Sequence, residues 1–320
     1  MSVDKKISVI LPVYNGREFL QDSVQSVLSQ SFKFFDFFIL DDNSTDGSYD
    51  MLSQLEDDRI ILIKNETNKG LFYNLNLLIS KVETPLIKLW AQDDIMKTDC
   101  LGEFVNFYQN HPEVGFIYCA ADTIDESGNQ KASHFNDTTP EILTTSMHAR
   151  IAYYTGSIAG NIANVCLTKA GINKVGFFDE KMIISADFDM WVRLAEFYPT
   201  GFINKKLIKT RDHKNQLSKK MEYLVYHGIE DFIVFRKLDN YLPIEERKNG
   251  RRIMHINKLF TYYIIILKFF AHGDFKNGFR LLKVLSDYTS IARLTMIFIS
   301  RKIGLSKPSE FDVVGKSKIY

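Results

Sequence analysis

The sequence is poor in cysteine and in long apolar runs. Cys100, Cys119 and Cys166 are its only cysteines, and their spacing matches no metal-binding or disulfide framework. The longest apolar run, 259–270, contains Lys268, and at roughly 12 residues it is too short to span a bilayer. The first residues show no apolar segment followed by a small-residue cleavage site. These absences favour a reduced, cytoplasmic location.

An excess of either charge is also missing. Lysine and arginine total 40 against 39 acidic residues, which gives a net charge of +1. Proteins that bind nucleic acid usually carry a basic excess, so nucleic acid is not an expected partner. The phosphate-binding patterns G-x-x-x-x-G-K-[ST] and G-x-G-x-x-G do not occur either, which argues against a P-loop ATPase or a dinucleotide enzyme.

The first 120 residues alternate between apolar runs and segments with helical spacing. The apolar runs predict strands at 7–13, 37–40, 60–63, 86–90 and 114–120. Strands separated by single helices imply an α/β fold with a mostly parallel central sheet and flanking helices. Strand and helix signals return at 162–211, after a polar, turn-rich stretch that we interpret as a mobile or acceptor-facing excursion at 121–160.

Beyond about residue 217 the pattern is almost purely helical. We therefore expect an α/β domain at 1–218 and a C-terminal helical region at 219–320. Leu294 and Ile297 lie beside Arg293 in this region, which indicates an amphipathic helix with a basic edge. Packing against the first domain or forming a homodimer is the favoured interpretation, and contact with an anionic membrane surface is the alternative.

Two pairs of acids follow predicted strands, one directly and the other after two intervening residues. Asp41 and Asp42 come after the second strand, and Asp93 and Asp94 after the fourth. Ligands of such sheets bind beyond the carboxyl ends of the strands. One or two carboxylates suit Mg²⁺ or Mn²⁺ when phosphates complete the metal's shell, and Asp42 could accept hydrogen bonds from a base or ribose. Taken alone, each pair is more often a capped or solvated turn than a functional site.

Three further residues have side chains suited to chemistry. Asp187 opens a predicted helix, where it could be a general base or an acid stabilised by the helix dipole. His213 follows the strand-like segment 202–208 and could bind a metal or a phosphate, although most single histidines on loops do neither. Tyr14 could stack on a nucleobase, although a packed tyrosine is the commoner outcome.

The order of these segments resembles family 2 glycosyltransferases. The resemblance covers about 5–218 and rests on SVILPVYN at 8–15, SVLSQSF at 26–32, DDNSTDGS at 41–48, NKG at 68–70, AQDD at 91–94, VGFFD at 175–179, DFDMWVRL at 187–194 and RDH at 211–213. It implies an A-type glycosyltransferase fold, a nucleotide-diphosphate sugar donor and inversion at the anomeric carbon by direct displacement. The Q-x-x-R-W signature of processive members is absent, which favours single additions.

The resemblance also implies a role for individual residues. Asp187 would be the catalytic base, and a divalent metal, Mn²⁺ or Mg²⁺, would be bound by Asp94 and His213. The nucleotide sugar would be bound by Pro12, Tyr14, Asp42, Lys69 and Asp93. Two positions depart from the family pattern: Ala91 stands where the first acid of a D-x-D often lies, and Ala186 replaces a common acid before the base.

We therefore expect an inverting glycosyltransferase that moves a sugar to a hydroxyl of a glycan or lipid-linked acceptor during surface polysaccharide biosynthesis. The interpretation requires the carboxylates of Asp42, Asp94 and Asp187 to converge on one diphosphate. A sugar-nucleotide nucleotidyltransferase is an alternative, but such enzymes usually carry a glycine-rich loop after the first strand. A non-catalytic nucleotide-sugar-binding module is another. The expected location is cytoplasmic, or the inner face of the cell membrane if the helical region binds lipid.

Overall fold

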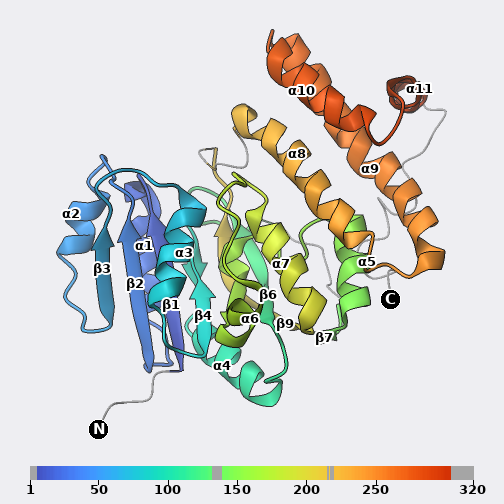
Figure 1. The fold of residues 1–320 in the computed structure, drawn as a ribbon. Coiled ribbons are helices and arrows are strands. Elements are labelled where there is room, and N and C mark those ends of the chain that lie inside the picture. The colour runs from blue at the N-terminus through green and yellow to red at the C-terminus, as the bar shows by residue number, and fades with distance from the viewer. Residues whose placement is uncertain (1–5, 132–138, 215, 217–219, 304–320) are drawn as a thin grey trace. The chain divides into compact units, whose positions relative to one another are not determined.

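The computed structural model describes residues 6–131, 139–214, 216 and 220–303 (Figure 1). The chain divides into two compact units, each built from more than one segment. The first comprises Met1–Thr145, Ala159–Lys181 and Asp189–His213, and the second Ser146–Ile158, Met182–Phe188 and Lys214–Tyr320. The second unit therefore includes two segments from the part of the chain that we expected to form the α/β domain.

The first unit is an α/β structure in which helices flank a single sheet. Its strands are β1 (Ile7–Val13), β2 (Phe35–Asp41), β3 (Ile60–Lys64), β4 (Leu86–Leu89), β5 (Ile95–Met96), β6 (Phe116–Ile124), β7 (Ile142–Leu143), β8 (Val165–Thr168) and β9 (Thr200–Arg211). Its helices are α1 (Arg17–Leu28), α2 (Ser48–Ser53), α3 (Leu71–Lys81), α4 (Cys100–Asn110), the 3₁₀ turn η1 (Ile162–Asn164) and α6 (Lys169–Val175). Helix α7 (Ala186–Phe197) begins in the second unit and continues into the first.

The strand order is β3-β2-β1-β4-β8-β6-β9-β5, with β7 paired to β9. Neighbours from β3 to β4 are all parallel, which confirms the α/β sheet with flanking helices. The other half is mixed, because β8 is antiparallel to both β4 and β6. Hydrophobic periodicity carries no information on strand direction, so the sequence indicated a strand near this position but not its reversal.

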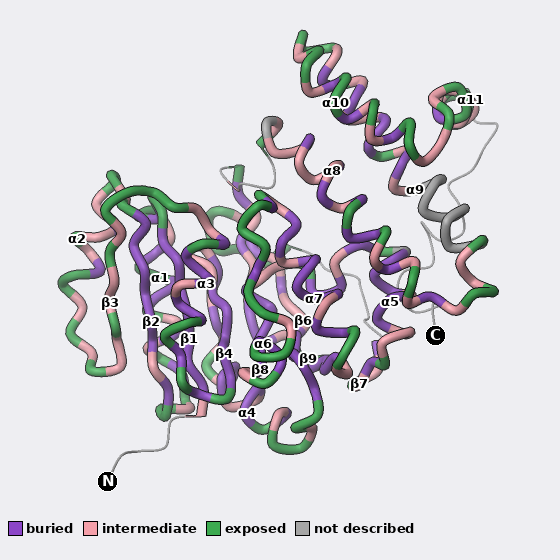
Figure 2. The backbone as a smooth tube through the Cα atoms, in the orientation of Figure 1, coloured by how far each residue is buried: buried purple, intermediate pink, exposed green. Residues whose placement is uncertain are grey.

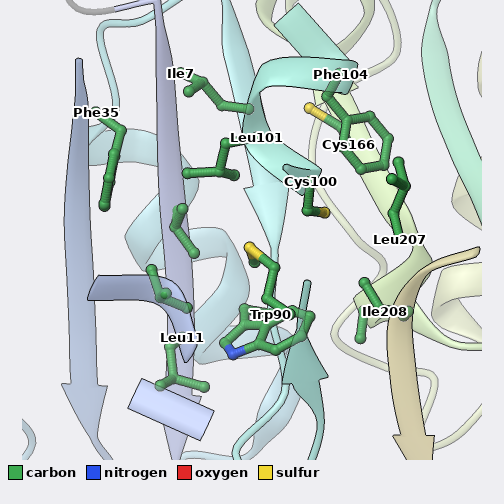
Figure 3. Packing of buried hydrophobic residues seen from close by; sticks show 14 of the residues in the cluster. Ile7, Leu11, Phe35, Trp90, Cys100, Leu101, Phe104, Cys166, Leu207 and Ile208 are labelled. Atoms are coloured by element: carbon green, nitrogen blue, oxygen red, sulfur yellow. The ribbon is translucent and has the colours of Figure 1, made fainter. Parts of the chain in front are cut away.

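The core lies against both faces of the sheet. Every residue of β1 is buried, as expected for a parallel strand that is covered on both sides. Alternate β1 residues, among them Ile7 and Leu11, pack with Leu101 and Phe104 of α4 and with Trp90 (Figure 3). Helix α3 contacts β1 and β2 and covers the opposite face. Figure 2 shows the central strands as buried along most of their length.

The stretch that we interpreted as a polar excursion is more ordered than its composition suggests. Strand β6 continues to Ile124, and β7 and helix α5 (Thr145–Thr155) lie further on. Polar composition misled the prediction here, because α5 buries Ile151, Ala152 and Tyr153 through tertiary packing. Part of the excursion, 132–138, lies outside the described residues.

The second unit is helical. Besides α5 it contains α8 (Met221–Leu238), α9 (Ile244–Ala271), α10 (Phe275–Ser286) and α11 (Ile291–Lys302), and α9 packs against both α10 and α11. Aromatic rings fill its interior: the Phe232 and Tyr288 rings lie 4.5 Å apart, and Phe235 packs against Tyr153 of α5. In the described part of the chain, no helix combines the length and the apolar character that crossing a membrane requires.

Candidate active site

Four strand ends meet at one edge of the sheet. Strands β1, β2 and β4 are parallel. Because β8 is antiparallel to β4 and to β6, and β6 is parallel to β9, β9 also runs in the direction of β1. The segments that follow Val13, Asp41, Leu89 and Arg211 therefore lie at the same edge, called the carboxyl edge below. This is the edge at which α/β proteins bind ligands.

Asp42 anchors the loop that follows β3. It is 1% exposed. Its Oδ1 accepts hydrogen bonds from Asn65 Nδ2 at 2.7 Å and from the backbone N–H of Lys69 at 2.8 Å, and its Oδ2 accepts one from the N–H of Gly70 at 2.9 Å. Gly70 has φ +89°, a conformation that glycine adopts without strain. Asp42 thus holds the 65–70 loop in place, and the exposed Lys69 is part of that loop.

The loop after β1 is tied to the loop after β4. The Tyr14 N–H donates to Gln92 Oε1 at 2.9 Å, and Gln92 Nε2 donates back to the Tyr14 carbonyl at 3.2 Å. A Cβ on Gly16 would lie 2.6 Å from the Gln92 side chain, so the close approach depends on glycine. Tyr14 is left 47% exposed at the carboxyl edge.

The same loop is tied to the loop after β2. The Asn15 N–H donates to Ser44 Oγ at 3.0 Å, and Asn15 Oδ1 accepts from the Thr45 N–H at 2.8 Å. The Arg17 N–H donates to Asp46 at 2.9 Å. Burial alone would raise the pKa of Asp46, but hydrogen bonds from Ser48 and Arg17 lower it below its ordinary value. The three loops therefore form one connected surface around Tyr14.

Asp93 and His213 meet at the carboxyl edge. Asp93 Oδ2 lies 2.8 Å from His213 Nε2, and the Asp93 side chain is 22% exposed. The two residues are 120 positions apart in sequence and are brought together because β4 and β9 end on the same side. The structure thus brings His213 to Asp93, whereas the predicted metal ligands were Asp94 and His213.

Asp94 is placed differently from Asp93. It is 1% exposed; its Oδ1 accepts from the Arg211 N–H at 2.8 Å and its Oδ2 from Asn161 Nδ2 at 3.2 Å. Burial and the neighbouring charge of Asp93 raise the pKa of Asp94 to about 7. The carboxyl group of Asp94 thus faces protein donors, whereas that of Asp93 is partly accessible.

Asn161 and Lys88 are two residues of this region that sequence reasoning missed. Lys88 is fully buried in β4, and its ammonium group donates to the carbonyls of Leu89, Ala163 and Val165. It thereby attaches the η1 segment, which carries Asn161 close to Asp94, to the centre of the sheet. An apolar strand with one lysine was the only signal in the sequence, because the carbonyls of Ala163 and Val165 come from 75 and 77 residues further along the chain.

Arg211 is a structural component of the edge. Its guanidinium donates to the carbonyls of Asp93 at 3.0 Å and Glu126 at 2.9 Å, and it lies 4.5 Å from the centre of the Phe19 ring. The same Phe19 ring lies 5.1 Å from the ring of His213. The RDH motif therefore contributes an arginine that fixes the acidic loop and a histidine that faces Asp93.

Asp187 belongs to the second unit, at the start of α7. Its Oδ1 accepts from the Phe188 N–H at 2.7 Å. Burial is the main cause that raises the pKa of Asp187 to about 7, and the charges of Asp231 and Glu230 add to it. Asp189 instead forms an ion pair with Arg193 at 2.7 Å. The convergence of Asp187 with Asp42 and Asp94 stays a prediction.

Pro12 differs from the other predicted binding residues in its accessibility. It is buried within β1, where it pairs with Leu40 of β2. Pro12 therefore presents little surface at the carboxyl edge, and the accessible aromatic group there is the ring of Tyr14, two positions later.

Asp93 and His213 are suited to a metal that a substrate helps to hold. Within the described residues, no group of three or more His, Cys, Asp or Glu side chains is placed to hold a metal ion. Mg²⁺ that binds with a nucleotide needs only one or two carboxylates, since phosphates and waters complete its shell. Asp93 and His213 supply an oxygen and a nitrogen at the carboxyl edge and fit such a shared site.

Sequence comparison assigns the chain to a family. Residues 8–175 match the profile of glycosyl transferase family 2. The chain belongs to this family. The match includes β1, the acidic loops at the carboxyl edge and Asn161, and it ends before α7 and the C-terminal helices. The chain is therefore a glycosyltransferase, as the resemblance implied.

Curated relatives carry the same assignment. A glycosyltransferase of Methanocaldococcus jannaschii, uncharacterised by name, is 28% identical over 70% of this chain and 78% of its own length. One from Rickettsia conorii is 27% identical over 67% of this chain; the chain spans only about a third of that protein, 35%. TuaG of Bacillus subtilis, whose name assigns it to teichuronic acid biosynthesis, is 37% identical over 32% of this chain and 41% of its own.

Solved structures share the fold. Residues 1–349 of S. aureus TarS, in complex with UDP-GlcNAc, align with a TM-score of 0.58 at 16% identity and cover 89% of this chain and 93% of theirs. The mannosyltransferase PcManGT of Pyrobaculum calidifontis, in complex with GDP-Man and Mn²⁺, aligns with a TM-score of 0.55 at 11% identity over 98% of this chain and 84% of its own. At this identity the likeness extends to the fold alone.

Proposed function

We propose that this glycosyltransferase transfers one sugar from a nucleoside-diphosphate sugar to a hydroxyl of a glycan or lipid-linked acceptor, with inversion. The acceptor oxygen attacks the anomeric carbon, the bond from that carbon to the diphosphate breaks, and the nucleoside diphosphate leaves. Asp187 takes the acceptor's proton. The observation that carries the proposal is the meeting of the Asp93–His213 pair with the Tyr14 and Asp42 loops at one sheet edge. Family membership favours this reaction over nucleotidyl transfer.

At the donor end we assign different tasks to the two adjacent acids. When bound, a divalent cation neutralises the charge that develops on the leaving diphosphate. Asp93 and His213 are the residues that would hold it, since the Asp93 side chain is partly accessible. Asp94, which we predicted as the metal ligand, uses both oxygens on Arg211 and Asn161, and we propose that it fixes the loop on which Asp93 lies. Tyr14 would stack on the base and Lys69 would face the diphosphate.

Surface polysaccharide assembly is the proposed setting. The name of TuaG places that relative in teichuronic acid biosynthesis, and a lipid-linked acceptor would lie at a membrane surface. We further propose that the C-terminal helices bring the enzyme to an anionic membrane, because α10 exposes two phenylalanines beside basic side chains. A homodimer formed through the same surface is the competing proposal.

The test is ligand binding followed by site variants. UDP- and GDP-linked sugars are screened by thermal shift with and without Mn²⁺, and the donor that stabilises the protein is used to measure release of nucleoside diphosphate with acceptor present. Asp93→Asn should lose most of the Mn²⁺-dependent shift, because it removes a charged ligand, whereas Asp189→Asn, which alters an ion pair outside the edge, should keep it. Asp187→Asn should abolish turnover and retain donor binding. Normal turnover by Asp187→Asn would rule out the base assignment.

A further inference from the structure

A carboxylate of helix α8 holds the segment that leads into Asp187. Glu230 is 5% exposed. Its Oε1 accepts the N–H of Ile183 at 2.8 Å, and its Oε2 accepts the N–H groups of Ile184 and Ser185, each at 2.9 Å. Hydrogen bonds to an ionised acceptor are shorter and stronger than neutral ones. Three consecutive backbone groups are thus fixed by one side chain immediately before α7 begins.

The next residue of α8 adds a second attachment. Asp231 Oδ1 accepts from Ser185 Oγ at 2.7 Å, and its Oδ2 accepts from Tyr262 Oη of α9 at 2.5 Å. In the first turn of α7, the ring of Phe188 packs edge-on against Phe235 of α8, with centroids 5.6 Å apart. The start of α7 is therefore held by α8 through polar and apolar contacts on both sides of Asp187.

We infer that Glu230 and Asp231 are positioning residues for Asp187, so that the C-terminal helices set the geometry of the catalytic base. The inference rests on the proposed role of Asp187. A carboxylate beside the N-terminus of a helix satisfies donors that have no partner within the helix, and here the acids come from a helix outside the family match at 8–175. The helical region is then part of the catalytic apparatus and more than an appendage.

The electrostatics of this unit agree with the geometry. The negative charges of Asp231 and Glu230 act on Asp187 in the direction that raises its pKa, secondary to burial. Among the described residues, His227 of α8 and Lys258 and Tyr262 of α9 are further titratable groups that interact with Asp231. Removing one of the two acidic charges should make Asp187 easier to ionise and shift the pH dependence of kcat. A variant that only disturbs the local structure would lower kcat without shifting its pH dependence.

Glu230→Gln in the full chain tests the inference. Glutamine keeps one acceptor oxygen, but in either orientation of its amide the NH2 group faces at least one of the three backbone N–H donors. We expect kcat to fall on the order of tenfold or more, the KM for the donor to stay within about twofold, and the acidic limb of the kcat–pH profile to move down by roughly half a pH unit. Asp231→Asn should move the limb in the same direction with a smaller loss of kcat, and it decides the question if Glu230→Gln does not fold.

The control is Asp287→Asn, which removes an exposed acid from the end of α10 in the same unit. It should change neither kcat nor the acidic limb of the kcat–pH profile. Wild-type kcat and an unmoved limb in folded Glu230 and Asp231 variants would overturn the inference. A fall in kcat with an unmoved limb would also overturn it, because it would indicate a structural role only. Full activity of Asp187→Asn would instead show that the proposed function has failed, so the two failures are distinguishable.

Discussion

At the scale of single residues, two carboxyl groups are distinguished by their raised pKa values. The pKa values of Asp94 and Asp187 are each raised to about 7, and burial is the main cause in both cases. Perturbed carboxyl groups of this kind gather at functional sites because burial and neighbouring charge are what tune them. A base whose pKa lies near the working pH is well matched to accepting the proton of an acceptor hydroxyl.

The protonation of Asp187 predicts a stability effect that needs no substrate. Its pKa rises from an ordinary value of 3.8 to about 7 on folding, so between these values the folded form holds a proton that the unfolded form has released. The free energy of unfolding should therefore fall as pH rises through this window, by up to about 1.4 kcal/mol for each pH unit. Asp187→Asn removes this pH-dependent contribution. Its free energy of unfolding should therefore increase relative to that of the wild type as the pH is raised from 4.5 to 8.

Denaturant titrations of both proteins across this range provide the measurement. The Asp287→Asn variant, which removes an exposed carboxyl group, serves as the reference. A constant difference between wild type and Asp187→Asn at every pH would contradict the raised pKa.

At the scale of elements, the carboxyl edge depends on loops that hold one another. Gly16 has φ −101°, which other residues adopt, so the constraint at this position is the closeness of Gln92 and not the backbone conformation. In Gly16→Ala the new Cβ would displace the Gln92 amide, because the two would be 2.6 Å apart. The hydrogen bonds between Gln92 and the backbone of Tyr14 would be lost with it.

We therefore expect Gly16→Ala to weaken nucleotide-sugar binding about three- to tenfold, which corresponds to roughly one hydrogen bond. Gln92→Ala should have a similar effect, and the double variant should be no worse than either single one, because both changes remove the same contact. Isothermal titration calorimetry of the wild type, the two single variants and the double variant measures the binding affinities of this double-mutant cycle. Additive losses in the double variant would show that the two loops act independently.

The sequence predicted the edge but not all of its parts. Parallel strands end on one side, so acids after β2 and β4 could be placed near each other from their order alone. Asn161 and Glu230 could not be found in this way, since their partners lie 67 and about 45 positions away and nothing local distinguishes them. The reversal of β8 and the helix α5 were missed for the same reason: strand direction and burial are set by tertiary packing, which periodicity does not record.

At the scale of the whole molecule, the surface of the helical region bears on where the enzyme works. Helix α10 buries Gly278, Leu281 and Leu285, while Phe275 and Phe279 are 57% and 61% exposed. Exposed basic side chains alternate with these rings along the helix, namely Lys276, Arg280 and Lys283. Aromatic side chains beside lysine and arginine are typical of helices that lie on an anionic bilayer surface.

Vesicle binding of the full chain should therefore depend on lipid charge and on these rings. Co-sedimentation with vesicles of phosphatidylcholine and phosphatidylglycerol should exceed that with phosphatidylcholine alone and should weaken as salt rises, since each basic residue contributes about 1 kcal/mol near an anionic surface. Joint replacement of Phe275 and Phe279 by serine should reduce binding at least about tenfold. Ile244→Ser, at a residue 79% exposed at the start of α9, should not. Membrane contact predicts that vesicle binding requires both the two phenylalanines and the anionic lipid. If the phenylalanine variant co-sediments with vesicles as well as the wild type does, the membrane proposal is wrong. If the variant instead dissociates a dimer in sedimentation velocity, the surface serves dimerisation.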